Sequence, residues 1–119
     1  MESINIATKL SKINEHWSPK IMASMNDYQF KLVKFKGEFT WHSHNNTDEV
    51  FIIIEGQMDI HFRDKVVEVR KGEMIVVPKG VEHKPFAEEE CHAMVVERND
   101  TVNTGEERNE YTVDRLDWI

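Results

Sequence analysis

From Tyr28 to Glu97 the sequence consists of short stretches of alternating character, and this pattern constrains the fold more than any other feature. A period of two is typical of strands, whose successive side chains point to opposite faces. Glycines at 37, 56 and 72 and the turn segment 78–80 interrupt the pattern, as turn residues do. The predicted strands are 29–36, 38–44, 49–55, 57–63, 66–70, 74–77, 83–87 and 91–97, with 88–90 as a hairpin tip. Many short strands with tight turns predict an all-β antiparallel sandwich or barrel.

Both ends of the chain differ from this central region. Apolar residues recur at helical spacing before Pro19, at Ile6, Leu10, Ile13 and Trp17. This spacing predicts one amphipathic helix over roughly 4–17, ended by the residue before proline. The segment 99–119 is a polar arm that ends in Leu116, Trp118 and Ile119, and we expect this apolar end to pack on the barrel or on a partner subunit. We therefore predict one domain over 1–119, with the barrel at roughly 28–98.

Composition limits the class of protein. The 119 residues are 39% hydrophobic and 31% charged, which is ordinary for a soluble globular protein, and the longest apolar run, 50–54, is too short to cross a bilayer. The net charge of -7, without a basic cluster, argues against nucleic acid as a partner. With one cysteine and no visible secretory signal, the cytoplasm is the expected location.

Three histidines and a glutamate form the candidate site, namely His42, His44, Glu49 and His83. On an extended strand His42 and His44 would share one face, ~7 Å apart, so that both imidazoles could reach one ion. Neutral imidazoles and a carboxylate suit divalent ions of intermediate softness, and four protein ligands leave room for one or two more. The sequence therefore predicts one metal ion inside the barrel.

Two segments of the sequence resemble the signature motifs of the cupin superfamily. The first begins at Gly37 and contains His42, His44 and Glu49 before Gly56; the second runs from Gly72 through Pro78-Lys79-Gly80 to His83. The sequence departs from the family pattern at two positions. The first segment has four residues rather than five between Gly37 and His42, and Ala87 stands where the second motif usually has Asn. The resemblance implies a jelly-roll barrel, with a short N-terminal helix here, that holds one divalent ion (Fe, Mn, Ni or Zn) on the three histidines and the glutamate.

Two functions remain open at this stage. The resemblance favours a metal-dependent enzyme of the dioxygenase, isomerase or decarboxylase type that acts on a small oxygen-bearing molecule. The alternative is a barrel that binds or senses a small molecule or the ion without catalysis. Tyr28 and His92 are the candidates for a further acid or base. The expected pocket walls are Phe51, Ile53, Met58, Ile60 and Phe62.

Alternation also predicts what the outer surface looks like. Glu49, Phe51 and Ile53 should share the inner face of their strand, which leaves Val50, Ile52 and Ile54 outside. By the same reasoning Phe39 and Trp41 should point outward. This outer surface is more apolar than one helix and a tail could cover, and it predicts a homodimer.

Overall fold

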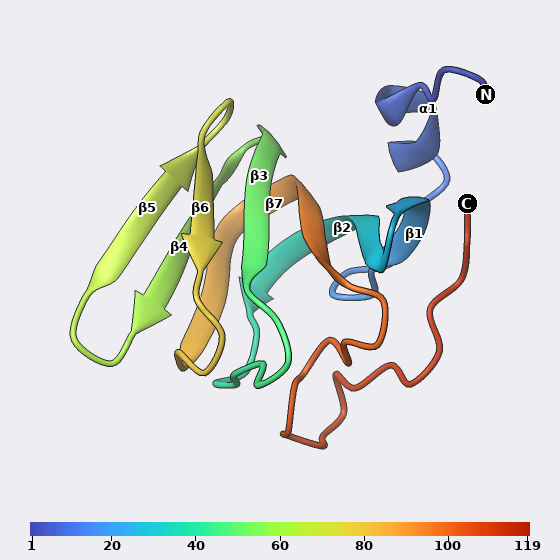
Figure 1. Cartoon of the computed structure of the whole chain (residues 1–119). Coiled ribbons are helices and arrows are strands. Elements are labelled where there is room, and N and C mark those ends of the chain that lie inside the picture. Colours follow the sequence, from blue (N-terminus) through green and yellow to red (C-terminus); the bar gives the residue numbers. More distant parts are fainter.

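The computed structural model describes residues 1–119 as one short helix and seven strands (Figure 1). In chain order they are α1 (Ile6–Leu10), β1 (Lys20–Met25), β2 (Tyr28–Glu38), β3 (Glu49–Glu55), β4 (Gln57–Phe62), β5 (Val66–Arg70), β6 (Met74–Val77) and β7 (His83–Arg98). All pairings between these strands are antiparallel. The predicted all-β fold with a short N-terminal helix is confirmed. No helix is long and apolar enough to span a membrane.

The 16-residue strand β7 organises the sheet. One edge of β7 pairs with β2. Along its other edge, residues 83–86 pair with β4 and residues 92–96 pair with β3. β3 and β4 thus form one strand broken at Gly56, where φ is +84°. A Cβ at Gly56 would lie 2.9 Å from the carbonyl oxygen of Glu90, so only glycine lets the two strands follow β7 this closely. β6 then pairs with β3, and β5 with β4.

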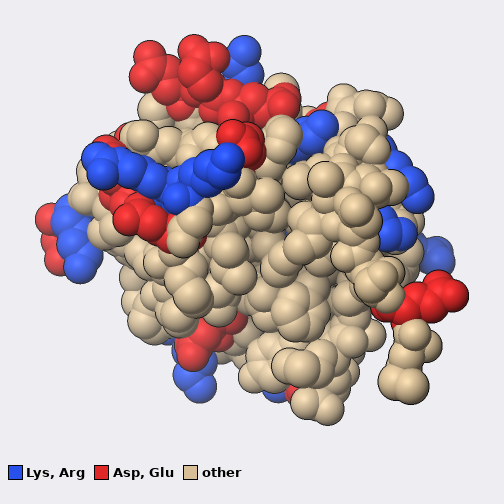
Figure 2. Space-filling model, turned by 90° about the horizontal axis from the view of Figure 1, so that it is seen from above, with Lys and Arg blue, Asp and Glu red and all other residues tan.

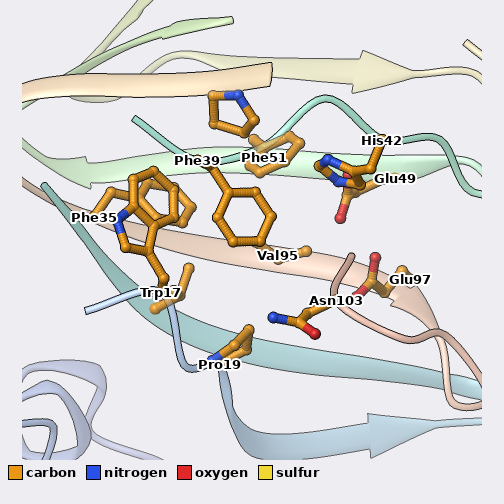
Figure 3. A pocket seen from close by; sticks show the side chains of 12 residues that line it. Trp17, Pro19, Phe35, Phe39, His42, Glu49, Phe51, Val95, Glu97 and Asn103 are labelled. Atoms are coloured by element: carbon orange, nitrogen blue, oxygen red, sulfur yellow. The ribbon is translucent and has the colours of Figure 1, made fainter. Parts of the chain in front are cut away.

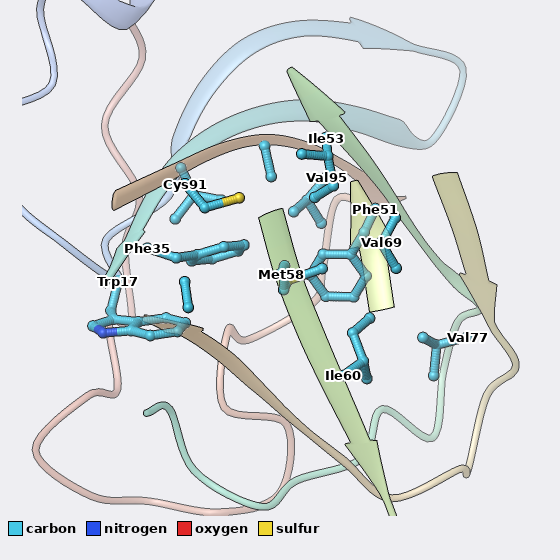
Figure 4. Packing of buried hydrophobic residues seen from close by; sticks show 13 residues of the cluster. Trp17, Phe35, Phe51, Ile53, Met58, Ile60, Val69, Val77, Cys91 and Val95 are labelled. Atoms are coloured by element: carbon cyan, nitrogen blue, oxygen red, sulfur yellow. The ribbon is translucent and has the colours of Figure 1, made fainter. Parts of the chain in front are cut away.

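A cluster of 13 buried residues fills the space between the strands (Figure 4). On β3 the predicted alternation is confirmed, because Phe51 and Ile53 are buried while Val50, Ile52 and Ile54 are half-buried on the other face. Fully burying one such side chain contributes roughly 1.5 to 3 kcal/mol.

A second, smaller cluster lies on the outer face of the sheet. It contains Leu10, Ile13, Met22 and Leu32, with Ile119 packed against it. The N-terminal segment and the end of the chain therefore cover part of the outer face. The outer face continues from β7 across β3 to β6, where Val96, Val50 and Val76 are paired neighbours. Val76, on the edge strand β6, is exposed.

The helix is shorter than the predicted range 4–17. It has five residues and ends at Leu10, with Ser11 as its C-cap, and Trp17 has a positive φ of 61°. Trp17 lies in the barrel core, where its ring stacks on Phe35 at 4.7 Å and its indole nitrogen donates to the carbonyl of Lys36 at 2.9 Å. Its helical spacing in the sequence therefore reflected burial in the barrel and not a longer helix.

Three strand boundaries also differ from prediction. β1 was not predicted, so the sheet begins at Lys20 and not near 28. Residues 39–48 form no strand; they contain one isolated bridge, between His42 and His83. Residues 88–90 are not a hairpin tip but part of β7, at an irregularity opposite Phe35 and Gly37. Their side chains are exposed, so three consecutive glutamates are compatible with a strand and do not require a turn.

The end of the chain returns to β1 (Figure 1). The amide of Ile21 donates to the carbonyl of Asp117 at 2.8 Å, and the amide of Ile119 donates to the carbonyl of Ile21 at 3.0 Å. Leu116 and Ile119 are half-buried, but Trp118 is 58% exposed. Ile119 packs on the outer cluster as predicted, and Leu116 is half-buried. For Trp118, packing on a partner subunit stays a prediction.

Candidate metal centre

The three histidines and the glutamate singled out from the sequence converge in the structure. All four are buried, and one potential ligand atom from each lies within 4.8 Å of the others. We call His42, His44, Glu49 and His83 the His/Glu cluster. These residues could hold a metal ion, because imidazole nitrogens and a carboxylate oxygen at such spacing match the ligand preferences of several divalent metals.

The segment that carries His42 and His44 differs from the expected strand, whereas Glu49 and His83 begin strands as predicted. Glu49 begins β3 and His83 begins β7, whereas His42 and His44 lie in the irregular segment 39–48. Two backbone hydrogen bonds between His42 and His83, of 2.9 and 3.0 Å, fix the first position, and the amide of Gly80 donates to the carbonyl of His44 at 2.8 Å. The histidines converge because this segment is held against the residues preceding and beginning β7.

Backbone carbonyls orient two of the imidazole rings. Nδ1 of His42 lies 2.9 Å from the carbonyl oxygen of Thr40, and Nδ1 of His83 lies 2.9 Å from that of Val81. A carbonyl oxygen can only accept, so each Nδ1 carries a proton and Nε2 is the nitrogen of each ring that can bind a metal. In His83 this Nε2 lies 3.0 Å from Oε1 of Glu49. A lone pair facing a carboxylate at that distance requires a proton or a metal ion between them.

His44 supplies a second observation in favour of a cation. Both of its ring nitrogens are buried and neither has a hydrogen-bond partner, although Nε2 lies 3.4 Å from Oε1 of Glu49. Leaving a buried polar atom without a partner costs about 1 to 3 kcal/mol. A cation bound in the cluster would satisfy Nε2.

The protonation states of the cluster also suit metal binding. Burial, reinforced by the nearby His83, lowers the pKa of His42 to about 4. Burial alone would raise the pKa of Glu49, but contacts with His44 and His83 outweigh it and hold that pKa well below its usual value. At neutral pH His42 is therefore neutral and Glu49 ionised, which are the forms that bind a metal.

A cavity of about 30 Å³ adjoins the cluster (Figure 3). Aromatic side chains, among them Trp17 and Phe35, line one end, and the polar side chains His42, Glu49, Glu97 and Asn103 line the other. This volume holds roughly two water molecules. The cavity is therefore small, and apolar along most of its wall.

The cavity walls are not the predicted ones. Of the five expected residues only Phe51 lines the cavity. Ile53, Met58 and Ile60 are at most 1% exposed in the core, so they fill space and border no cavity. Phe39 does not point outward as predicted; it packs between Trp17 and His42. Trp41, in contrast, is half-buried with the guanidinium of Arg63 over its ring.

Neither predicted acid or base lies near the cluster. Tyr28 is exposed at the start of β2. His92 points away from the barrel interior and bonds Glu90 at 2.8 Å. The inner face of β7 carries Cys91, Ala93, Val95 and Glu97, so His92 lies on the opposite face and is not in a position to act as an acid or base at the cluster. Burial raises the pKa of the Cys91 thiol to about 12, so this thiol is inert near neutral pH.

Glu97 is the site residue that sequence reasoning missed. Its side chain is buried beside the cavity, with Oε1 2.8 Å from Nζ of Lys31, which is 1% exposed. Burial and the negative charge of Glu49 raise the pKa of Glu97, while Lys31 opposes this shift. The alternation of small and apolar residues at 91, 93 and 95 was the available signal that 97 faces inward.

Comparison with known proteins identifies the family. Residues 31–97 match the cupin domain family Cupin_2. The chain belongs to the cupins. The matched segment contains the whole His/Glu cluster and has Lys31 and Glu97 as its first and last residues, whereas the arm that follows lies outside it.

Two solved structures and one further protein are similar along most of this cupin. A cupin-2 domain protein from Shewanella frigidimarina is 58% identical, with a TM-score of 0.80 over 81% of this chain and 94% of that one. Protein NMB1881 from Neisseria meningitidis is 39% identical, with a TM-score of 0.76 over 82% and 100% of the two chains. The uncharacterized protein YdbB of Bacillus subtilis is 33% identical over 67% of this chain and 72% of its own length.

Proposed function

We propose that this cupin is a metal-dependent enzyme that acts on a small oxygen-bearing molecule. His42, His44, Glu49 and His83 would hold one divalent ion, of Fe, Mn, Ni or Zn. One observation carries the proposal: Nε2 of His83 and Nε2 of His44 both face Oε1 of Glu49, at 3.0 and 3.4 Å. Nε2 of His44 is buried and has no hydrogen-bond partner.

The reaction would be of the dioxygenase, isomerase or decarboxylase type. An ion held by three histidines and one glutamate keeps one or two positions for a ligand and, when bound, polarises the ligand oxygen. The chain supplies the surroundings: aromatic walls exclude water and lower the local dielectric, which strengthens electrostatic contacts with the ligand. Glu97 adds a second carboxyl group beside the cavity.

A second candidate is a barrel that binds a small molecule or the ion without converting it. The size of the cavity favours this alternative, because about 30 Å³ accommodates little more than water. A substrate larger than two or three non-hydrogen atoms would require the cavity walls to move apart.

Metal analysis of protein purified without metal-affinity resin tests the ligand set. We expect about one equivalent of a divalent ion in the wild type and little in His44→Ala, since an incomplete set of ligands binds weakly. His61→Ala is the matched control, because His61 lies on β4 outside the cluster and should leave the content unchanged. Equal metal content in the wild type and His44→Ala would refute the ligand assignment.

Activity separates the two candidates. The metal-loaded protein is incubated with a panel of small hydroxy and keto acids, diols and sugars, and products are measured before chelation, after chelation and after reloading with each metal. Product that disappears on chelation and returns with one particular metal supports the enzyme. Binding of a panel member without turnover by any metal form supports the alternative.

A further inference from the structure

We propose that Glu97 contacts the ligand directly, accepting a hydrogen bond from a hydroxyl group whose neighbouring oxygen meets the His/Glu cluster. The ligand class is therefore small α-hydroxy acids and α-hydroxy ketones. This inference rests on the proposed function, because it places the ligand at the same cluster.

The position of Glu97 on β7 brings it next to the cluster. Val50 on β3 pairs with Val96 on β7, so the preceding residue Glu49 and the following residue Glu97 are opposite each other across the two strands. Both side chains are buried on the inner face, and Cβ atoms of such partners lie about 4.5 to 5.5 Å apart. A ligand oxygen near Glu49 therefore has its neighbouring substituent within reach of Glu97.

One oxygen of Glu97 lacks a hydrogen-bond donor, although the neighbouring Glu49 carboxylate contacts Glu97 and raises its pKa. Oε1 accepts from Lys31 at 2.8 Å, whereas Oε2 is buried and has no hydrogen-bond partner. The other polar residue of this wall, Asn103, already uses its amide within the arm: Nδ2 donates to the carbonyl of Tyr111 at 2.8 Å, and Oδ1 accepts from the amide of Val113 at 2.9 Å. Oε2 of Glu97 is thus the polar atom of this wall that still lacks a partner.

Lys31 acts as a positioning residue. It is 1% exposed and lies on β2, where it holds Oε1 and so fixes the plane of the Glu97 carboxylate. Replacing a buried ion pair by apolar residues is often neutral or stabilising, so packing alone does not explain this pair. Holding one oxygen while leaving the other toward the cavity orients an acceptor for a ligand.

The cavity determines which groups the ligand can present there. An acceptor with an unused lone pair requires a donor, and the His/Glu cluster, when it carries a cation, requires an oxygen ligand. The small volume, about 30 Å³, favours two groups on adjacent carbon atoms, and the remaining atoms of such a ligand enter only if the cavity walls move apart. A hydroxyl beside a carboxylate or a carbonyl meets both conditions.

The test compares two probes that differ in a single donor. Glycolate and fluoroacetate are close in size, but the fluorine of fluoroacetate cannot donate a hydrogen bond. Each is titrated into the full-length protein carrying Co²⁺, and the visible spectrum of the ion reports binding. We expect the wild type to bind glycolate at least about ten-fold more tightly, because the hydroxyl of glycolate supplies a donor to the buried oxygen of Glu97 and fluoroacetate does not.

Glu97→Gln should remove this preference. The Gln oxygen can still accept from Lys31, which leaves the amide NH₂ where Oε2 stands and replaces an acceptor by a donor. Glu68→Gln on β5, whose side chain is exposed, is the matched control and should keep the preference. Co²⁺ content should remain at one equivalent in both variants, a readout that separates ligand contact from support of the ion.

Four results would overturn the inference. If the wild type binds both probes equally, or if Glu97→Gln keeps the preference for glycolate, Glu97 does not contact the ligand, while the proposed function stands. If Glu97→Gln loses the ion, Glu97 supports the metal and not the ligand. If neither glycolate nor any other small oxygen ligand changes the wild-type spectrum, the proposed function and this inference both fail.

Discussion

Replacing Lys31 by Met should destabilise this cupin severely, by leaving Glu97 buried without its partner. Lys31 and Glu97 are 1% and 2% exposed, so water cannot replace the lost ammonium group. Removing one member of such a pair typically costs about 3 to 5 kcal/mol. For a chain of this length about 1 kcal/mol corresponds to roughly 3 to 5 °C, so the melting temperature should fall by roughly 10 to 25 °C.

Urea unfolding of the metal-free protein at pH 7 measures the effect, and the double variant Lys31→Met/Glu97→Leu is the control. The double variant removes both charges, and it should unfold within about 1 kcal/mol of the wild type or be more stable. The deficit of Lys31→Met should also shrink toward pH 5, because burial raises the pKa of Glu97 and the folded state then takes up a proton more readily than the unfolded state. A single variant as stable as the wild type, or a double variant as unstable as the single, would refute the reasoning.

Four further outcomes are expected. As the pH falls from 6.5 to about 4, the free energy of unfolding of the metal-free protein should decrease by up to about 3 kcal/mol. The pKa of His42 is lowered from 6.5 to about 4 in the folded state, so over this range the unfolded state binds the proton first. Urea titrations at several pH values measure the decrease, and an equal decrease in a His42→Leu variant would contradict this. Light scattering should give a dimer mass, and Val76→Lys, at the exposed edge of the outer apolar face, should lower it without changing metal content. Deleting 116–119 should lower the melting temperature in a thermal scan, since Ile119 packs on the outer cluster; an unchanged scan would show that the contact adds nothing. Gly105→Ala should weaken metal binding in a competition titration with a chelator, because a Cβ there would lie 1.9 Å from the carbonyl oxygen of Ser43 and would displace the segment that carries His44.

The sequence predicted the members of the His/Glu cluster better than their local structure. His42 and His44 were placed on one strand face, but they lie in an irregular segment and reach the cluster because backbone contacts hold that segment against His83 and Gly80. Residue type and spacing are properties of the sequence, and these identified the members. The path of the backbone between them depends on partners more than 30 residues away, and local periodicity does not reveal such partners.

The errors at Trp17, His92 and Glu97 have related causes. Helical spacing and strand alternation record which residues are buried, but not what buries them: Trp17 fits a helix face and yet packs on Phe35 in the barrel. On β7 the run of glutamates at 88–90 was taken as a turn, and this obscured the phase of the residues that follow. Glutamate side chains are usually exposed, so burial of Glu97 was not expected. Its place in the site is apparent only from the structure, where it pairs with Lys31.

Figure 2 shows how charged side chains are distributed over one face of the molecule. On the face in Figure 2, both acidic and basic side chains lie mostly toward the margin, several basic ones follow one another along the right edge, and the centre is uncharged. This distribution agrees with the net charge of -7. The affinity of a protein for the phosphate backbone of a nucleic acid comes from clustered cations, and the centre of this face has none.

The central position of β7 also has a consequence for how the protein folds. β2, β3 and β4 all pair with β7; without it, the remaining pairs β1–β2, β3–β6 and β4–β5 are three separate two-stranded ribbons, each marginal in water. A nascent chain that has not yet emerged past residue 98 therefore has no common sheet to join. Since His83 is the first residue of β7, the complete set of metal ligands arises only when that last strand docks, and metal uptake during refolding should report the final step of barrel closure.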